Sequence, residues 1–350
     1  MTKLLVLGDI NLKNVSNANE PFATAGDTLR TADVVLANLE CCLFSPSSQD
    51  GQYGEDKAFH ADPEVGREAL KLGNVSAVGM ANNVNFGTAA ILSSLANLDA
   101  IGVKHSGAGV DADAANAPVV VNSKGAKIGF FQRSTLYWTT GHAATTTHPG
   151  IAVIAAHTAY QVPMHGNALK DGTKPLNRAG VPPQIITWAD PRHLEQLRAD
   201  IAALRKETDY VVVSVHWGLD KDVLTYMEQI GRAAIDAGAD LVFGHGPHYS
   251  LPVEVYRGKP IFYGLGSFSF HTGHGGKHGA WVGMMVKLDV EGGKAHNVRV
   301  QFVRNNDRNE TELCRLADVQ STIDEVGSKS AVYGTRFRAE GNDLLIEGIE

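Results

Sequence analysis

Cysteine is scarce in this chain, which has three among its 350 residues: Cys41, Cys42 and Cys314. An odd number that includes one adjacent pair does not form a disulfide framework, and this usage predicts a protein of a reducing compartment. Two adjacent cysteines also bind a single ion poorly. We therefore interpret Cys41 and Cys42 as small packing residues.

Long apolar runs are missing as well. The first run, Leu4 to Leu7, ends at Gly8-Asp9 and is far too short for the hydrophobic part of a signal peptide. No later run approaches the roughly 20 residues that span a bilayer. We expect a cytoplasmic protein with no membrane partner.

Basic residues are not in excess, because 31 Lys and Arg stand against 38 Asp and Glu, giving a net charge of −7. This balance argues against a nucleic-acid partner, for which a basic face is expected. A small anionic substrate remains compatible with it, since a local cationic site can lie in an acidic protein. The sequence also lacks a phosphate-binding P-loop, a dinucleotide-binding fingerprint and the strand-to-helix turn that carries a serine nucleophile.

The sequence does contain an alternation of apolar, strand-length runs with helical patterns, followed by tight hairpins. This order is typical of a layered α/β domain. The expected buried strands are 4–7, 34–37, 75–80, 127–131, 210–215 and 241–243, and the expected helices are 24–31, 62–72, 88–98, 189–206, 227–237 and 316–326.

Residues 136–188 interrupt the alternation. They are rich in Thr, His, Gly and Pro, and a loop of this length is usually a lid, a binding loop or disordered. We predict one domain over residues 1–304 that contains this insertion or lid. A C-terminal helix and tail, 305–350, are expected to pack on the same domain, and a homo-oligomer is compatible with the sequence.

Residues able to bind a metal follow several of the predicted strands. In open α/β sheets ligands bind beyond the carboxyl ends of the strands, so these side chains are expected to meet. Carboxylates, imidazoles and amides without thiolates suit Zn²⁺, Mn²⁺ or Fe²⁺. Such a set is too large for one tetrahedral ion and suits two ions that share a carboxylate. Its members are Asp9, Asn11, Glu40, Asn83, His216, His245 and His248.

These residues lie in five short motifs whose order along the chain is informative. The motifs are Gly8-Asp9, Asn38-Leu39-Glu40, Ala81-Asn82-Asn83, His216-Trp217-Gly218 and Gly244-His245-Gly246-Pro247-His248. Together they resemble the CapA family, the poly-γ-glutamate capsule-synthesis type of protein within the calcineurin-like metallophosphatase superfamily. The resemblance covers roughly residues 4–131 and 209–288.

The resemblance implies a four-layer α/β/β/α sandwich of the metallophosphoesterase type, with two divalent metal ions (Mn, Fe or Zn) in a surface cleft. By matching motifs, Asp9 and His248 would bind the first ion, helped by Asn11. Glu40 would bridge the two ions. In the wider superfamily a histidine stands at the position of Asn11, so this residue is a departure.

The same matching implies that the second ion is held by Asn83, His216 and His245. Here too the chain departs from the family, which usually has Asn-Asn-His where this chain has Asn82-Asn83-Val84. The family's histidine is placed to protonate the leaving group, and valine cannot do this.

Catalytic candidates therefore have to be sought elsewhere. Asn82 belongs to the metal-binding motif. A substitute acid could come from the Gly-rich segment after Phe270, and we favour His271 over His274 and His278. Each of these histidines has an alternative interpretation as an ordinary polar loop residue.

Three further residues are candidates for substrate binding. Arg133 follows a predicted strand and could hold a carboxylate or phosphate by a bidentate contact, with a structural salt bridge as the alternative. Trp217 either lines the cleft or packs in the core. Ser267 stands in Gly266-Ser267-Phe268, where the family tends to have Gly-Asn-Phe.

Two functions fit these observations. The first is a metal-dependent hydrolase in which a dinuclear centre and a metal-bound hydroxide attack a phosphoester or a small amide of γ-glutamyl type, the substrate being a small molecule or a short polymer. The alternative is a non-catalytic or accessory protein of poly-γ-glutamate or capsule-type polymer biosynthesis, which the missing histidine favours. A nuclease is a weaker interpretation, because of the acidic charge balance.

Overall fold

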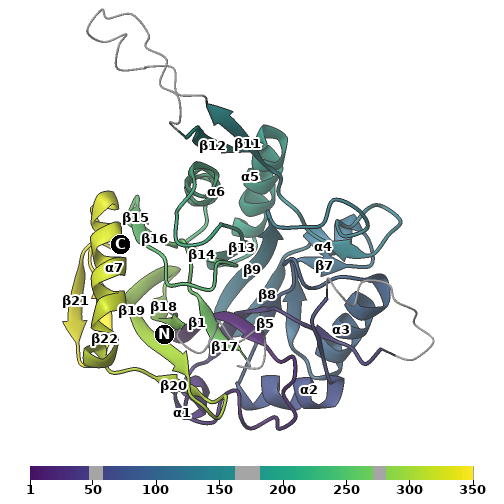
Figure 1. The fold of residues 1–350 in the computed structure, drawn as a ribbon, viewed down its shortest axis with the longest axis horizontal. Coiled ribbons are helices and arrows are strands. Elements are labelled where there is room, and N and C mark those ends of the chain that lie inside the picture. The colour runs from purple at the N-terminus through teal and green to yellow at the C-terminus, as the bar shows by residue number, and fades with distance from the viewer. Residues whose placement is uncertain (47–57, 162–181, 271–280, 350) are drawn as a thin grey trace, which may run out of the picture.

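The computed structural model describes residues 1–46, 58–161, 182–270 and 281–349, which form two large β-sheets with helices on their outer faces (Figure 1). The expected mixed α/β class is thereby confirmed. Three short strand pairs lie outside the large sheets. They are β3 (Cys42–Leu43) with β4 (His60–Ala61), β7 (Ala108–Gly109) with β10 (Gly150–Ile151), and β11 (Ala156–Gln161) with β12 (Gln184–Ala189).

The first sheet has ten strands, in the order β21-β22-β19-β18-β1-β2-β5-β6, with β17 on β1 and β20 on β19. Its parallel part contains β1 (Thr2–Asn11), β2 (Val34–Leu39), β5 (Ala77–Gly79), β6 (Lys104–Ser106) and β17 (Ser267–Phe270). Its antiparallel part contains β18 (Val282–Glu291), β19 (Lys294–Asn305), β20 (Thr311–Leu313), β21 (Phe337–Glu340) and β22 (Asp343–Ile346).

The second sheet has six strands, in the order β15-β16-β14-β13-β9-β8. Four of them run parallel: β9 (Ala126–Ser134), β13 (Tyr210–His216), β14 (Leu241–His245) and β16 (Lys259–Phe262). Two hairpin partners complete its edges, β8 (Val119–Ser123) and β15 (Val253–Tyr256).

The helices are α1 (Gly26–Arg30), α2 (Pro63–Leu72), α3 (Thr88–Ala100), α4 (Ala112–Asn116), α5 (Pro191–Arg205), α6 (Thr225–Asp236) and α7 (Gln320–Ser330), with 3₁₀ turns at η1 (Leu316–Val319) and η2 (Ala331–Tyr333). The best-predicted helix starts are those of α2 and α5. In each, an Asp side chain accepts hydrogen bonds from the first turn and a Pro occupies the first helical position. Helix α1 is shorter than expected and α7 begins later, because 3₁₀ geometry occupies its predicted start.

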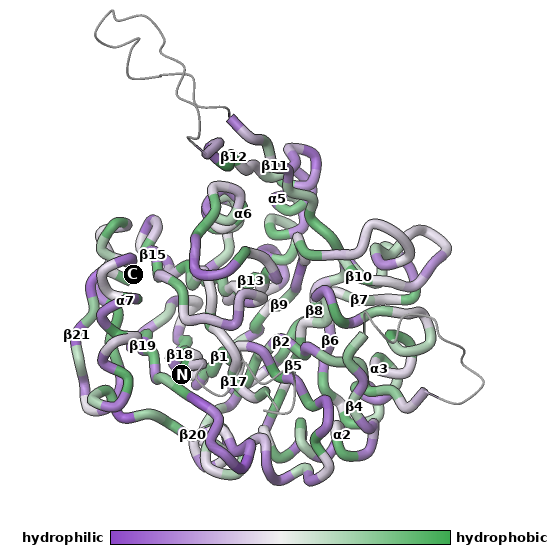
Figure 2. The backbone as a smooth tube through the Cα atoms, viewed as in Figure 1, coloured by the Kyte–Doolittle hydropathy of each residue, from purple (hydrophilic) through white to green (hydrophobic). Residues whose placement is uncertain are grey.

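Buried side chains alternate along the central strands, because successive residues of a strand point to opposite faces. On β1, Leu4 and Val6 point toward the second sheet, where they join Phe130 and Phe243 in an apolar cluster shared by both sheets. The opposite faces carry two further clusters, one beneath α1, α2 and α3 and one beneath α5 and α6. Figure 2 shows hydrophobic residues concentrated along these central strands.

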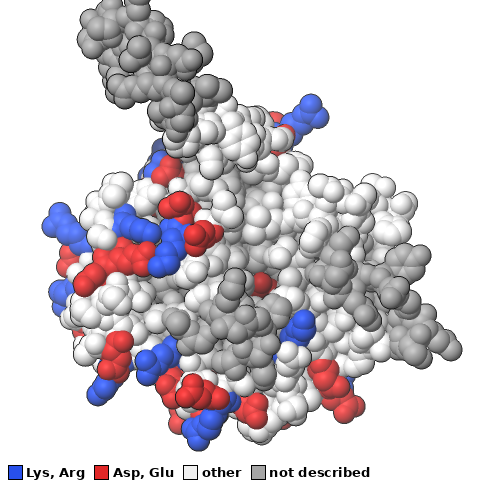
Figure 3. All heavy atoms as spheres, in the orientation of Figure 1, with Lys and Arg blue, Asp and Glu red and all other residues white. Residues whose placement is uncertain are grey.

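The outer surface is mixed in character. On the face shown in Figure 3, Lys and Arg side chains are interspersed with Asp and Glu. The antiparallel strand pair β11–β12, which comes almost entirely from residues 136–188, stands out from the body in Figure 1. Within the described part of the chain, no helix has both the length and the apolar character needed to cross a membrane.

Candidate metal centre

Polar side chains from both sheets meet where the parallel strands end. Asp9 lies near the end of β1, Glu40 follows β2 and Asn83 follows β5. His216 and His245 are the last residues of β13 and β14, and these two residues are paired in the sheet register. The carboxyl ends of parallel strands therefore bring together residues that are far apart in the sequence.

One group of possible metal ligands consists of Asp9, Glu40 and His248. The Nδ1 atom of His248 lies 3.1 Å from Asp9 Oδ2, and its Nε2 atom lies 3.6 Å from Glu40 Oε1. Both carboxylates are buried, whereas the His248 side chain is 20% exposed. The group is thus accessible from solvent through His248.

The other group consists of Asp9, His216 and His245. The two imidazoles approach each other with 2.9 Å between their Nδ1 atoms, and His245 Nδ1 lies 3.7 Å from Asp9 Oδ1. On its far side, His216 Nε2 lies 2.8 Å from Asn83 Oδ1. Asp9 is the residue common to both groups, whereas the resemblance assigned the shared position to Glu40.

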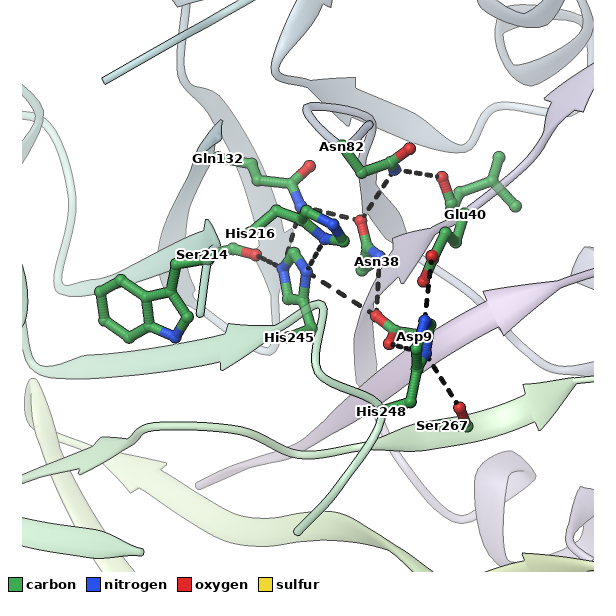
Figure 4. A network of polar contacts seen from close by, with 12 residues as sticks. Asp9, Asn38, Glu40, Asn82, Gln132, Ser214, His216, His245, His248 and Ser267 are labelled. Atoms are coloured by element: carbon green, nitrogen blue, oxygen red, sulfur yellow. Dashed lines mark hydrogen bonds and ion pairs between the residues drawn. The ribbon is translucent and has the colours of Figure 1, made fainter. Parts of the chain in front are cut away.

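A shell of hydrogen bonds holds these side chains in place (Figure 4). Asn38 donates to Asp9 Oδ1 at 2.8 Å. Gln132 donates to Asn38 Oδ1 at 2.8 Å and lies 2.9 Å from His245 Nε2. Ser214 Oγ is 2.7 Å from the same imidazole nitrogen. Because Nε2 of His245 is engaged in this way, its Nδ1 is the atom that faces Asp9 and His216.

The surroundings of His216 and His245 keep these two imidazoles neutral. Burial lowers the pKa of His245 from 6.5 to about 4, and it lowers that of His216 well below 6.5, with the neighbouring His245 adding to the effect. Burial by itself raises the pKa of Asp9, but the hydrogen bond and charge of His248 outweigh it, so that the pKa falls below its ordinary range. Burial and the adjacent charge of Asp9 raise the pKa of Glu40 well above 4.5.

Two buried polar atoms in this region have no hydrogen-bond partner among the described residues, Glu40 Oε2 and Asn11 Nδ2, and Asp9 Oδ2 is approached only by His248 Nδ1, at 3.1 Å. An unsatisfied buried polar group costs about 1–3 kcal/mol, and more when it is charged. A bound cation would satisfy the two carboxylate oxygens. The neutral imidazoles of His216 and His245 and the ionised carboxylate of Asp9 are also the protonation states that ligate metals. The donor set therefore fits divalent ions.

The loop after β14 positions His248 by an unusual backbone and an aromatic contact. His248 has a φ of 65°, in the left-handed region, and Gly246 before it has a φ of 119°. The ring of His248 is stacked on Trp281, with centroids 4.6 Å apart and planes 5° apart, and Phe270 contacts it edge-on at 5.1 Å. Ser267 Oγ lies 3.3 Å from its Nδ1.

Two predicted polar residues take other positions in the structure. Asn82 is fully buried, and its amide donates to Asn38 Oδ1 and Leu39 O while its oxygen accepts backbone N–H groups of the same loop. All its hydrogen-bonding groups are used, so it shapes the loop that carries Asn83 instead of acting on a substrate. The Oδ1 atom of Asn11 accepts from the backbone N–H of Lys13 at 2.9 Å.

The three candidates for substrate binding are all buried. Trp217 is fully buried and donates to Tyr263 O, and a Cβ on Gly244 would lie 2.1 Å from its indole nitrogen. It packs in the core beneath the histidine loop. Arg133 points away from the cluster and pairs with Asp200 at 2.8 Å, which is the structural salt bridge of the alternative. Ser267 is 4% exposed and faces His248.

The predicted acid His271 lies outside the described residues, together with His274 and His278. Val84 is buried beside the cluster, at the position where the family usually has histidine.

Sequence reasoning missed Asn38, Gln132, Ser214 and Trp281. For Gln132 a signal existed, because it precedes Arg133 in a buried strand and successive strand residues face opposite sides. Choosing between the two required knowing which face of β9 is turned toward the first sheet. Trp281 carries no local signal of its contact with His248.

Comparison with known proteins places the chain in a family. A family model described as bacterial capsule synthesis protein PGA_cap matches residues 3–272. The chain belongs to this family. The membership agrees with the resemblance in the metal-binding motifs.

Individual relatives match parts of the chain at moderate identity. The PGA biosynthesis protein CapA of Bacillus subtilis is 48% identical over 75 residues, which are 21% of this chain and 20% of that protein. A probable polyglutamine synthesis accessory protein of Mycobacterium tuberculosis is 29% identical over 243 residues, covering 67% of this chain and 54% of that protein. The chain spans at most 66% of the length of the curated relatives it matches.

A solved structure, that of a hypothetical protein from Thermus thermophilus, aligns with 87% of this chain and 100% of its own, at 14% identity and a TM-score of 0.49.

Proposed function

We propose that this chain is a metal-dependent hydrolase that holds two divalent metal ions (Mn, Fe or Zn) where its two sheets meet. The observation that carries the proposal is the position of Asp9, which belongs to both groups of possible ligands. The two packed sheets with helices on both outer faces also support a four-layer α/β/β/α sandwich of the metallophosphoesterase type.

Each proposed ion has its own ligands. Glu40 and His248 would hold one, His216 and His245 would hold the other with help from Asn83, and Asp9 would contact both. Two divalent ions in such a site polarise a phosphoryl or carbonyl oxygen and activate water. The protein residues around them fix orientation: Asn38 holds the Asp9 carboxylate, while Gln132 and Ser214 hold the His245 ring.

The proposed substrate is a phosphoester or a small amide of γ-glutamyl type, either as a small molecule or as a short polymer. A general acid typically contributes about 10²–10⁴-fold. Val84 cannot supply one, and the assignment of this role to His271 stays a prediction. Substrates whose leaving group needs no protonation are therefore expected to react fastest.

The test is to load the full chain with Mn²⁺, Fe²⁺ or Zn²⁺, measure bound metal by elemental analysis, and screen phosphoesters and γ-glutamyl amides for turnover. We expect about two ions per chain and a hydrolytic activity that disappears in His216→Ala. Correctly folded wild-type protein that binds no metal, or turnover unaffected by His216→Ala, would contradict the proposal.

A second candidate is an accessory role in the synthesis of a poly-γ-glutamate or capsule-type polymer. The names of the Bacillus and Mycobacterium relatives favour it, as does the valine at position 84. A protein of this kind would keep its partner binding in the His216→Ala variant. Partner binding that survives loss of the metal ligands, combined with no turnover on any substrate class, would support this role over hydrolysis.

A further inference from the structure

A cavity lies behind β9, on the side of the strand that faces away from the metal-ligand cluster. Successive residues of a strand point to opposite faces, so Arg133 lines this cavity while Gln132 contacts His245 in the cluster. The cavity has a volume of about 240 Å³, and its walls come from β9, from the end of α4, from α5 and from the segment that follows β9. It is therefore a place separate from the candidate metal centre.

Part of the predicted insertion forms one wall of this cavity, and hydrogen bonds fix that wall on two sides. Toward β9, the backbone N–H of Ser134 donates to Ala152 O at 3.0 Å, and the N–H of Ile154 donates to Ser134 O at 2.9 Å. Toward α5, the backbone N–H of Ala155 donates to Nδ1 of His193 at 2.6 Å. The cavity is thus enclosed by segments that are bonded to one another.

Two N–H donors on residues that line the cavity have no hydrogen-bond partner among the described residues. The guanidinium of Arg133 uses Nη1 and Nη2 to donate to two backbone oxygens and to Asp200, which leaves its Nε–H unused. His193 accepts the Ala155 N–H at Nδ1, so the proton of its neutral ring is on Nε2, and this N–H is unused as well. The Arg133 side chain is only 4% exposed, so an acceptor inside the cavity would satisfy a donor that bulk water reaches poorly.

The charge and polarity of the lining favour a singly charged ligand with an apolar part. Among the described residues that line the cavity, Arg133 carries the one permanent charge and none is acidic. Asp200 lies outside the lining with both oxygens engaged in hydrogen bonds, and its charge balances part of the guanidinium charge. One negative charge is therefore accommodated better than the two of a phosphate dianion. The apolar part of the lining includes Ile151, Ile154 and Leu197, each at most 2% exposed.

We propose that this cavity is a binding site for a small aliphatic monocarboxylate. The carboxylate would accept hydrogen bonds from Arg133 Nε and His193 Nε2, and a hydrogen bond between two charged groups is among the stronger ones. The alkyl part would pack on the apolar lining. This site goes beyond the proposed hydrolase and does not depend on it. It gives Arg133 a role in addition to its ion pair with Asp200, and it gives part of the insertion a role in ligand binding.

The test follows the binding of isotope-labelled butyrate to the full chain by NMR titration. EDTA is present throughout, so that no metal-bound site competes for the ligand. Butyrate should bind about tenfold tighter than butyramide, which lacks the charge. It should also bind about tenfold tighter than acetate, which lacks two methylene groups. Inorganic phosphate should bind more weakly than butyrate.

Three variants assign the binding to this cavity. Arg133→Leu should weaken butyrate binding about tenfold or more. Because this variant also breaks an ion pair, His193→Asn provides an independent check: the asparagine oxygen can still accept the Ala155 N–H, but the Nε2–H is lost, so butyrate should bind about three- to tenfold more weakly. Arg205→Leu is the matched control, because it breaks the ion pair with Asp240 at the last residue of α5, outside the cavity lining. It should bind butyrate as the wild type does.

Several results would overturn the inference. They are butyrate binding that is unchanged in Arg133→Leu or in a folded His193→Asn, binding that falls equally in Arg205→Leu, and phosphate that binds as tightly as butyrate. Butyrate that binds only after Mn²⁺ is added would also overturn it, because the carboxylate would then be at the metal centre. Failure of the proposed hydrolase is a different observation, namely missing metal or turnover while butyrate binding in EDTA is intact.

Discussion

Acid should destabilise this fold through His245, a histidine whose side chain is completely buried. Its pKa is lowered from 6.5 to about 4 by burial, so between these values the unfolded chain binds a proton that the folded chain does not. The free energy of unfolding therefore falls as the pH drops from about 6.5 to about 4. At about 1.4 kcal/mol per pKa unit, the full loss is about 3.5 kcal/mol.

The measurement has to isolate this histidine, because Glu40 contributes with the opposite sign. Its pKa is raised by burial and by the charge of Asp9, so the folded chain binds a proton that the unfolded chain does not, and its contribution to stability grows as the pH falls. The useful quantity is therefore the difference in stability between the wild type and His245→Gln, in which the titrating ring is replaced by a neutral amide.

Urea unfolding of both proteins in EDTA, at intervals from pH 7.5 to 4.5, provides that difference. The wild type should lose its advantage over the variant steadily below about pH 6.5, by roughly 2–3 kcal/mol at the acid end. A difference that stays constant across this range would show that burial does not hold His245 in its neutral form, and the electrostatic account of the site would be wrong.

Other substitutions address three separate parts of the structure. Asp9→Asn should remove both bound metal ions and Glu40→Gln only one, as counted by elemental analysis; equal losses would refute a shared Asp9. Trp281→Leu should weaken the metal affinity of the His248 group about 10-fold or more, as for residues that orient metal ligands, with Trp281→Phe restoring most of it in calorimetric titrations. Arg133→Leu should lower the free energy of unfolding by about 3 kcal/mol, because it removes the charge partner of the partly buried Asp200 carboxylate, which then keeps the hydrogen bond from Gln196. Metal binding by Arg133→Leu should be unchanged. A loss of metal would show that Arg133 contributes to the metal site after all.

The sequence predicts which polar residues follow the strands, but it does not predict in which direction the side chains of a strand point. Apolar runs that end in Asp9, His216 or His245 indicate both a buried strand and the polar residue that follows it, so these positions were predictable. The direction of the side chains was not predictable, because the two faces of β9 are equally apolar in pattern. The sequence therefore indicates Arg133 as the site residue, whereas Gln132 is the one that contacts the cluster. Which face is turned to the other sheet is decided by packing between residues distant in the sequence.

Aromatic residues illustrate the same limit. Trp217 follows a strand end, and the sequence is compatible with a position in either the core or the cleft. Its indole packs against Gly244, where a Cβ would lie 2.1 Å from the indole nitrogen, and no local sequence pattern reveals this contact. Trp138 and Trp281 lie in segments without clear periodicity. Their contacts with Asn83 and His248 depend on chain segments meeting across the molecule. The shared role of Asp9 likewise follows from distances and not from motif order.

The span of the ligand set along the chain has a consequence for biogenesis. The earliest ligand is the ninth residue, and the last is at position 248. Neither group can assemble until β14 has docked beside β1, so capture of the proposed ions would belong to the final stage of folding and not to its nucleation. A ribosome-bound fragment that ends before His248 would lack part of the centre. Retention of metal would then report completed folding, and a destabilised variant should release ions before its secondary structure is lost.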